Sequence, residues 1–179
     1  QYFPVLGSVE TEIAERFRKG GGVPYDHYER FHEVMAEDSA QTVVAGLEEQ
    51  ILPLVPGLTE RLEQGIRVLD IGCGSGRALT RLAELYPRSL FSGFDLCDDA
   101  AALANAEAQA KGLENVAFAE CDVAGPDAFG KYDLITAFDA IHDQAKPATV
   151  LDNIAGALKP GGVFLMQDIR GSSYLSKNM

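Results

Sequence analysis

The chain has 179 residues, 46% of them hydrophobic and 23% charged, a balance typical of one globular domain and unlike that of a disordered or fibrous protein. Its 15 basic and 27 acidic residues give a formal net charge of −12, which repels phosphate and anionic lipid headgroups, so nucleic acid and membrane surfaces are poor candidate partners. No apolar run approaches the roughly 20 residues of a membrane helix and no secretory signal pattern opens the chain, so we expect a cytoplasmic protein.

Residues 1–58 show helical periodicity and no strand signal. A helix near Ser8 to Lys19 should end at the triple glycine Gly20–Gly22, and a second helical pattern runs from Tyr28 to Ile51. A capping-box pattern beginning at Asp38 predicts an interruption there. We expect this segment to form a helical cap. A lid that closes on a ligand and a cap packed permanently on the sheet are both compatible with the pattern.

Residues 59–179 alternate short apolar runs with helical patterns, which indicates an α/β sandwich around a parallel sheet. The predicted strands are Ile66–Ile71, Leu90–Phe94, Val116–Ala119, Tyr132–Phe138 and Val163–Gln167. The predicted helices between them are Gly76–Tyr86, Asp98–Lys111 and Pro147–Leu158.

The most informative segment, Val68–Arg77, joins an apolar strand to a helix through a turn that contains Gly72, Gly74 and Gly76. Glycines let the backbone approach a ligand closely and adopt dihedrals that a Cβ forbids. At the end of the next predicted strand stands Asp95, where an acid can accept both hydroxyls of a ribose. The turn therefore indicates an adenosine-type ligand, although a glycine pattern alone also fits a simple tight turn.

The glycine spacing decides between two ligand classes. The pattern is G-x-G-x-G, whereas dinucleotide folds use G-x-G-x-x-G. Asp70, at the end of the preceding strand, would oppose a pyrophosphate but favour a cationic ligand. NAD is therefore disfavoured, and an NAD-dependent oxidoreductase remains a weaker alternative.

With these features the sequence resembles the class I S-adenosylmethionine-dependent methyltransferases. The motifs that carry the resemblance are Asp70–Gly76, Gly93–Leu96, Glu120–Val123, Tyr132–Ile135 and Leu158–Gly162. The resemblance implies a Rossmann-like three-layer sandwich with a parallel sheet of order 3-2-1-4-5, and S-adenosyl-L-methionine as cofactor. It implies methyl transfer to a small-molecule acceptor; the alternative is a non-catalytic S-adenosylmethionine-binding module for regulation or assembly.

The resemblance also implies which residues hold the donor: Asp70, Gly72, Cys73, Gly74, Gly76, Asp95, Leu96, Asp122, Val123 and Phe138. In that arrangement the loop after Asp70 surrounds the methionine part and Asp95 accepts the ribose hydroxyls. Asp122 lies near the adenine amine, Val123 packs on the adenine ring, and Phe138 lies beside the donor. We expect the acids that close the first three strands to gather around one ligand.

His142 is the candidate general base, because it follows the carboxyl end of the fourth strand and its type suits proton transfer near neutral pH. Asp139 or Asp143 could orient its ring. The competing interpretation is that His142 and Asp143 only begin the next helix or bond to loop amides.

Three further expectations concern the N-terminal segment, the end of the chain and the edge of the sheet. The stretches Gly20–Tyr25 and Arg30–Glu37 resemble a branch of the family with an N-terminal winged-helix-like segment. Against the family pattern the chain stops soon after the fifth strand, so part of the acceptor pocket would be missing and this fragment can be inactive. The fifth strand would then be an exposed edge suited to self-association.

The spacing of the cysteines shows no metal-binding pattern. Cys73, Cys97 and Cys121 form no close pair and have no histidine nearby, which favours free thiols that line the pocket. We therefore expect no metal site.

Overall fold

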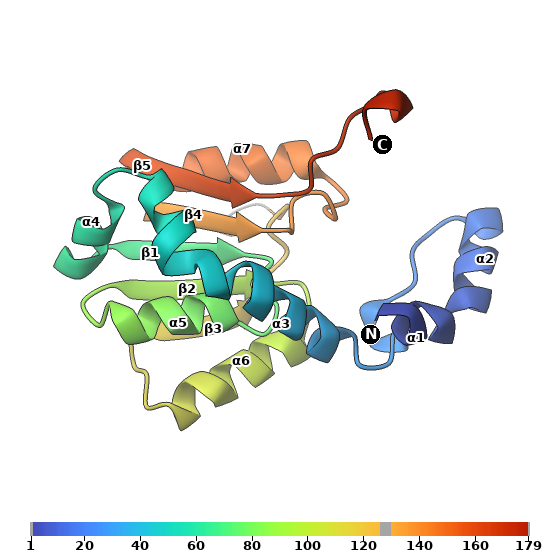
Figure 1. Ribbon diagram of the computed structural model, residues 1–179, viewed down its shortest axis with the longest axis horizontal. Helices are drawn as coiled ribbons and strands as arrows, with labels where there is room; N and C mark the ends of the chain where they lie inside the picture. The colour runs from blue at the N-terminus through green and yellow to red at the C-terminus, as the bar shows by residue number, and fades with distance from the viewer. Residues whose placement is uncertain (1, 126–129, 179) are drawn as a thin grey trace.

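The computed structural model describes residues 2–125 and 130–178, apart from the side chains of residues 26, 32 and 175. Its centre is a five-stranded sheet of order β3-β2-β1-β4-β5, in which every pairing is parallel (Figure 1). The strands are β1 (Arg67–Ile71), β2 (Leu90–Asp95), β3 (Val116–Glu120), β4 (Tyr132–Phe138) and β5 (Leu158–Gln167). The predicted Rossmann-like fold class and strand order are confirmed.

Helices cover both faces of the sheet. On one face, α4 (Leu58–Gln64), α5 (Arg77–Leu85) and α6 (Asp98–Ala110) share an apolar cluster with Val68 and Phe91 of the strands. On the other face, α7 (Pro147–Ala157) packs through Val150 and Ile154 against buried residues such as Leu69 and Ile135 (Figure 1). These two clusters form the core, and they leave the carboxyl ends of the strands free to build a site.

β5 begins earlier than predicted. The segment Leu158–Gly162, which precedes the predicted start at Val163, already belongs to the strand. The pairing register of β4 with β5 shifts between Tyr132 and Leu134 of β4. Among the described residues β5 pairs with β4 alone, and Met166 on it is 47% exposed. Self-association through this edge stays a prediction.

The N-terminal helices differ in part from the expected pattern. The helix predicted from Ser8 to Lys19 is present as α2 (Glu10–Lys19), which Gly20, with a φ of +78°, follows; an additional helix, α1 (Tyr2–Ser8), precedes it. Helix α3 (Phe31–Thr42) runs through Asp38, so the interruption predicted at that residue is wrong.

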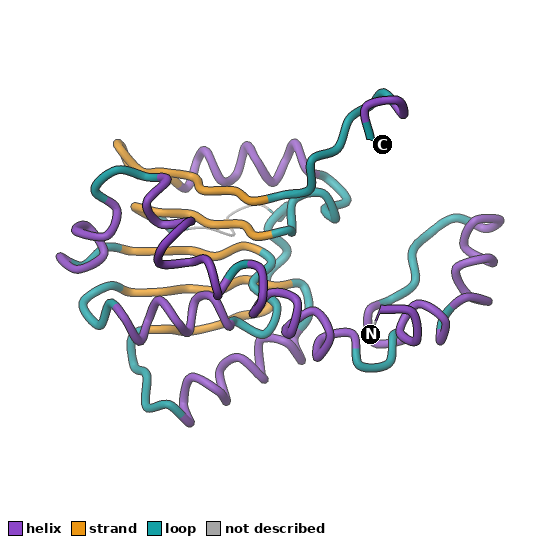
Figure 2. Tube along the Cα trace, viewed as in Figure 1, coloured by secondary structure: helices purple, strands orange, loops and turns teal. Residues whose placement is uncertain are grey.

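After α3 the backbone stays helical but its hydrogen bonding changes. A 3₁₀ turn (Val44–Gly46), a π-helical turn (Leu47–Ile51) and a second 3₁₀ turn (Leu52–Leu54) follow. Figure 2 shows α3 leading toward the carboxyl ends of the strands, whereas α1 and α2 stand away from the sheet. Two further short turns are Tyr25–His27 and Leu175–Lys177. In the described ranges, no helix combines the length and the apolar character needed to cross a membrane.

Candidate functional site

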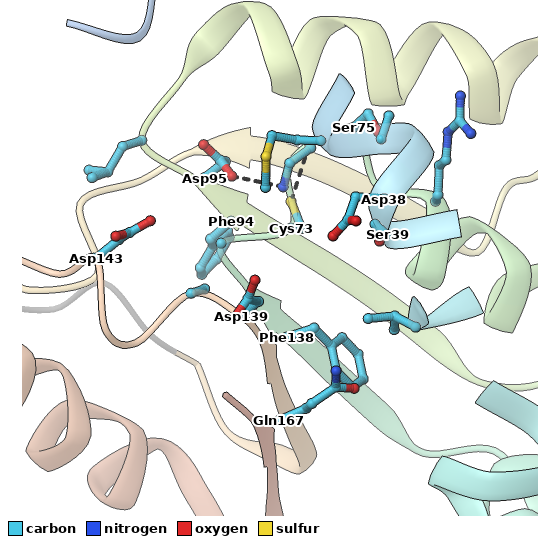
Figure 3. A pocket seen from close by; sticks show the side chains of 18 of the residues that line it. Asp38, Ser39, Cys73, Ser75, Phe94, Asp95, Phe138, Asp139, Asp143 and Gln167 are labelled. Atoms are coloured by element: carbon cyan, nitrogen blue, oxygen red, sulfur yellow. Dashed lines mark hydrogen bonds between the residues drawn. The ribbon is translucent and has the colours of Figure 1, made fainter. Parts of the chain in front are cut away.

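A cavity of about 420 Å³ lies at the carboxyl ends of the strands (Figure 3). Its wall combines the β1–α5 turn, the ends of the strands and one side of α3. Ligands of open parallel sheets bind at this edge, and the volume falls in the range of about 300–1,000 Å³ usual for small-molecule sites. The glycine turn is therefore part of a cavity, not a simple tight turn.

All three glycines of the turn have positive φ, and two of them also leave no room for a Cβ. A Cβ on Gly72 would lie 2.5 Å from the Cβ of Ala140, and one on Gly76 would lie 2.4 Å from a ring atom of Phe118. Both residues have positive φ, as does Gly74, where a Cβ would meet nothing within 4 Å. Gly72 and Gly74 line the cavity, whereas Gly76 is buried and allows close packing between α5 and β3.

Asp95 fixes the turn to the end of β2 and faces the cavity. The backbone N–H of Gly74 donates to its Oδ2 at 2.8 Å (Figure 3), and that of Cys97 donates to its Oδ1 at 3.0 Å. Each carboxylate oxygen keeps a further lone pair for a ligand hydroxyl. Leu96, the next residue, also lines the cavity and is 51% exposed.

Asp70 is buried in the sheet and does not line the cavity. Its carboxyl is 3% exposed and accepts a hydrogen bond from the Thr136 hydroxyl at 2.6 Å. Burial raises the pKa of Asp70 to about 7; the Thr136 hydrogen bond acts in the opposite direction, and the negative charge of Asp95 raises it further. The Asp70 carboxyl is therefore not held as a permanent anion.

Asp122 is exposed, and its Oδ1 accepts the N–H of Ala124 at 2.9 Å, which closes a turn after β3. Val123, next to it, is buried and lines the cavity. Of the three acids that close the first three strands, only Asp95 lies among the described residues of the cavity wall. That all three acids gather around one ligand stays a prediction.

Cys73 and Cys121 are free thiols, as expected, and both line the cavity. Burial is the main cause that raises the pKa of both thiols. They therefore serve the cavity as small apolar groups and not as reactive thiolates.

His142 lies in the loop after β4, five residues before α7 begins, so it does not start that helix. Its Nδ1 is 2.7 Å from Oδ1 of Asp168, and its backbone N–H donates to Oδ2 of the same carboxylate at 3.2 Å. Its Nε2 is 3.4 Å from Asp143, and Nδ1 is 3.8 Å from Asp139. The residue that holds the ring is therefore Asp168, not Asp139 or Asp143 as the sequence suggested.

Aspartates surround the part of the cavity near His142. Asp139, Asp143 and Asp168 line it from the segments after β4 and β5, and Asp38 lines it from α3; Figure 3 shows Asp139 and Phe94 between Asp143 and Asp38. Ligand atoms of Asp139, His142 and Asp168 lie within 4.8 Å of one another, close enough to hold a metal ion. The spacing of these three residues in the sequence predicts no such grouping.

Apolar side chains complete the wall. Tyr25 and Phe31 stack with ring centroids 4.9 Å apart, and Met35 follows on α3. Phe138, at the end of β4, lines the cavity as expected. The N-terminal segment therefore contributes directly to the site, as a cap or lid would.

Comparisons with known proteins agree with this architecture. Residues 62–179 match a methyltransferase domain family. The fatty-acid O-methyltransferase of Mycolicibacterium smegmatis is 31% identical over 107 residues, which are 60% of this chain and 38% of that protein. The trans-aconitate 2-methyltransferase of Deinococcus radiodurans is 33% identical over 101 residues, 56% of this chain and 37% of that protein.

Among solved structures, PKMT2 of Rickettsia typhi in complex with AdoHcy superimposes with a TM-score of 0.54 at 29% identity, covering 58% of this chain and 21% of that one. The chain thus spans less than half the length of each of these relatives. None of these matches favours an NAD-dependent oxidoreductase or a non-catalytic module. With the sheet order, the glycine turn and the family match in agreement, the chain belongs to the class I S-adenosylmethionine-dependent methyltransferases, as its sequence motifs predicted.

Proposed function

We propose that this chain catalyses methyl transfer from S-adenosylmethionine to a small-molecule acceptor. The observation that carries the proposal is the Asp95 carboxylate, which two backbone N–H groups hold at the edge of the cavity. The fatty-acid and trans-aconitate enzymes among the relatives support a small-molecule acceptor.

The residues of the cavity fit the donor. The open space beside Gly74 accommodates the methionine part next to the turn backbone, and Asp95 accepts the ribose hydroxyls. Leu96 and Val123 pack against the adenine ring, and Phe138 lies beside the reacting group. Asp70 and Asp122 act indirectly: Asp70 through its bond to Thr136 within the sheet, and Asp122 through the turn that presents Val123.

S-adenosylmethionine supplies a methyl group that its sulfonium already activates, so the protein mainly positions the reactants and excludes water. The lone pair of the acceptor forms the new bond to the methyl carbon while the carbon–sulfur bond breaks and leaves its electron pair on sulfur. His142, which is exposed and lies in the loop beside the cavity rather than among the described residues of its wall, takes the acceptor proton. If Nδ1–H donates to Asp168, Nε2 remains the basic nitrogen. Asp168 is a positioning residue, and the aromatic pair near α3 shields the site.

Calorimetry tests donor binding first. S-adenosylhomocysteine should bind the wild-type chain and NAD should not, and the Asp95→Asn variant should bind S-adenosylhomocysteine at least about tenfold more weakly because the ribose loses a charged acceptor. Binding of NAD alone would overturn the proposal.

A methyl-transfer screen with small hydroxyl and amine compounds then separates an enzyme from a binding module. With an acceptor in hand, His142→Asn should lower kcat by about 10²–10⁴ while donor affinity is retained. Asp168→Asn should shift the pH–rate profile, which a purely structural residue would not do. Undiminished turnover in His142→Asn would remove the base assignment.

A further inference from the structure

The cavity wall carries four aspartates besides Asp95. These four are Asp38, Asp139, Asp143 and Asp168, while Arg77 is the single basic residue among the described residues of the cavity wall. In the described ion pairs the four aspartates have no lysine or arginine partner; three of them contact His142. One histidine cannot neutralise this group.

The negative charge of the cavity also affects Tyr25, which lines the same wall. Its hydroxyl lies close enough to feel Asp143 and Asp95, and burial together with these two carboxylates raises the pKa of Tyr25. Like charges repel more strongly in a partly enclosed site than in open water. An anionic ligand group in this cavity would therefore be repelled by several carboxylates.

Apolar side chains from three elements also line the cavity, among polar ones such as Ser39 and Gln167. Phe31 and Met35 from α3, Phe138 from β4 and Ile169 after β5 face the same cavity. These side chains give an acceptor's carbon skeleton a surface to pack on, whereas the aspartates decide which charge its reacting end can carry.

We propose that the acceptor is an apolar molecule whose reacting group is an amine or a neutral hydroxyl, and that carboxylates are excluded. This inference rests on the proposed function of the same cavity. It separates this chain from relatives whose names denote fatty-acid or trans-aconitate methylation, because the aspartates would repel the carboxylate of such a compound.

The test uses three probes with one skeleton: 2-phenylethylamine, 2-phenylethanol and phenylacetate. Their affinities are measured by NMR titration on the full chain, in EDTA to keep the aspartates free of divalent cations, after calorimetry has shown that S-adenosylhomocysteine is bound. We expect the amine to bind most tightly, the alcohol next, and phenylacetate at least about tenfold more weakly than the alcohol.

Charge-neutralising variants show whether the aspartates cause this order. Asp38→Asn and Asp143→Asn should each raise phenylacetate affinity relative to the amine by at least about threefold, and the double variant by more. Asp152→Asn removes the same charge from an exposed position on α7 and should leave the ratio unchanged.

The two hypotheses fail in different ways. No binding of S-adenosylhomocysteine would contradict the proposed function itself. With S-adenosylhomocysteine bound, the inference is overturned if phenylacetate binds as tightly as the amine, if none of the probes binds, or if Asp152→Asn changes the ratio as much as the cavity variants do.

Discussion

Replacing Asp70 by asparagine probes a carboxyl buried in the middle of the sheet. Because the pKa of Asp70 is raised to about 7 from 3.8, the native state retains a proton that the unfolded chain releases between these values. The free energy of unfolding should therefore decrease as the pH rises through this window and level off above about pH 7. A rise of about three pKa units corresponds to about 4 kcal/mol in total.

Urea unfolding at several pH values measures this effect. Asparagine has the same shape as aspartate and can still accept a hydrogen bond from the Thr136 hydroxyl, but it has no proton to release. The unfolding free energy of Asp70→Asn should therefore lack the pH dependence that Asp70 causes. The difference in unfolding free energy between wild type and variant should change by about 2 kcal/mol between about pH 5.5 and 7, in favour of the variant at the higher pH. A flat difference for Asp70→Asn would refute the assignment of a raised pKa.

Three other predictions follow from the turn and the cap. Gly76→Ala should destabilise the fold by about 2–4 kcal/mol in urea unfolding, because its Cβ would overlap the Phe118 ring at positive φ. Gly74→Ala should cost only about 1 kcal/mol, since it meets open space, yet weaken S-adenosylhomocysteine binding; equal stability losses would contradict this contrast. Asp70→Asn should retain more affinity for S-adenosylhomocysteine than Asp95→Asn in calorimetry, and the reverse order would place Asp70 in contact with the donor. Limited proteolysis at Gly20–Gly22 should be slower with S-adenosylhomocysteine bound, because the segment that follows lines the cavity; an unchanged rate would indicate a permanently packed cap.

The strands and their order were predictable because buried parallel strands are continuous apolar runs separated by helical patterns. The position of Asp95 followed from the same pattern, since a residue at the end of β2 must lie beside the β1–α5 turn. The sequence did not predict where the Asp70 side chain lies. In the sheet register Asp70 lies opposite Thr136 of β4, so its carboxyl finds a hydroxyl inside the sheet, and a sequence shows no cross-strand partner.

Asp168 was missed for a related reason. It follows β5, 26 residues from His142, and only the pairing of Phe138 with Gln167 makes the two loops adjacent. The N–H of Asp139 donates to the carbonyl of Gln167 and joins the loops further. A usable signal existed, because polar residues directly after neighbouring parallel strands share one edge of the sheet, but it needs the order of β4 and β5 first.

The two halves of the cavity are built by different means, and this division has a functional consequence. In the proposed assignment backbone N–H groups and Asp95 form the donor half, and buried contacts of Gly72 and Gly76 hold its turn in place. The acceptor half depends on loop and helix side chains such as Asp38 and Asp143, whose replacement disturbs no strand pairing. Charge changes there should therefore alter acceptor choice while leaving donor affinity nearly constant, which is how one fold can serve many acceptors.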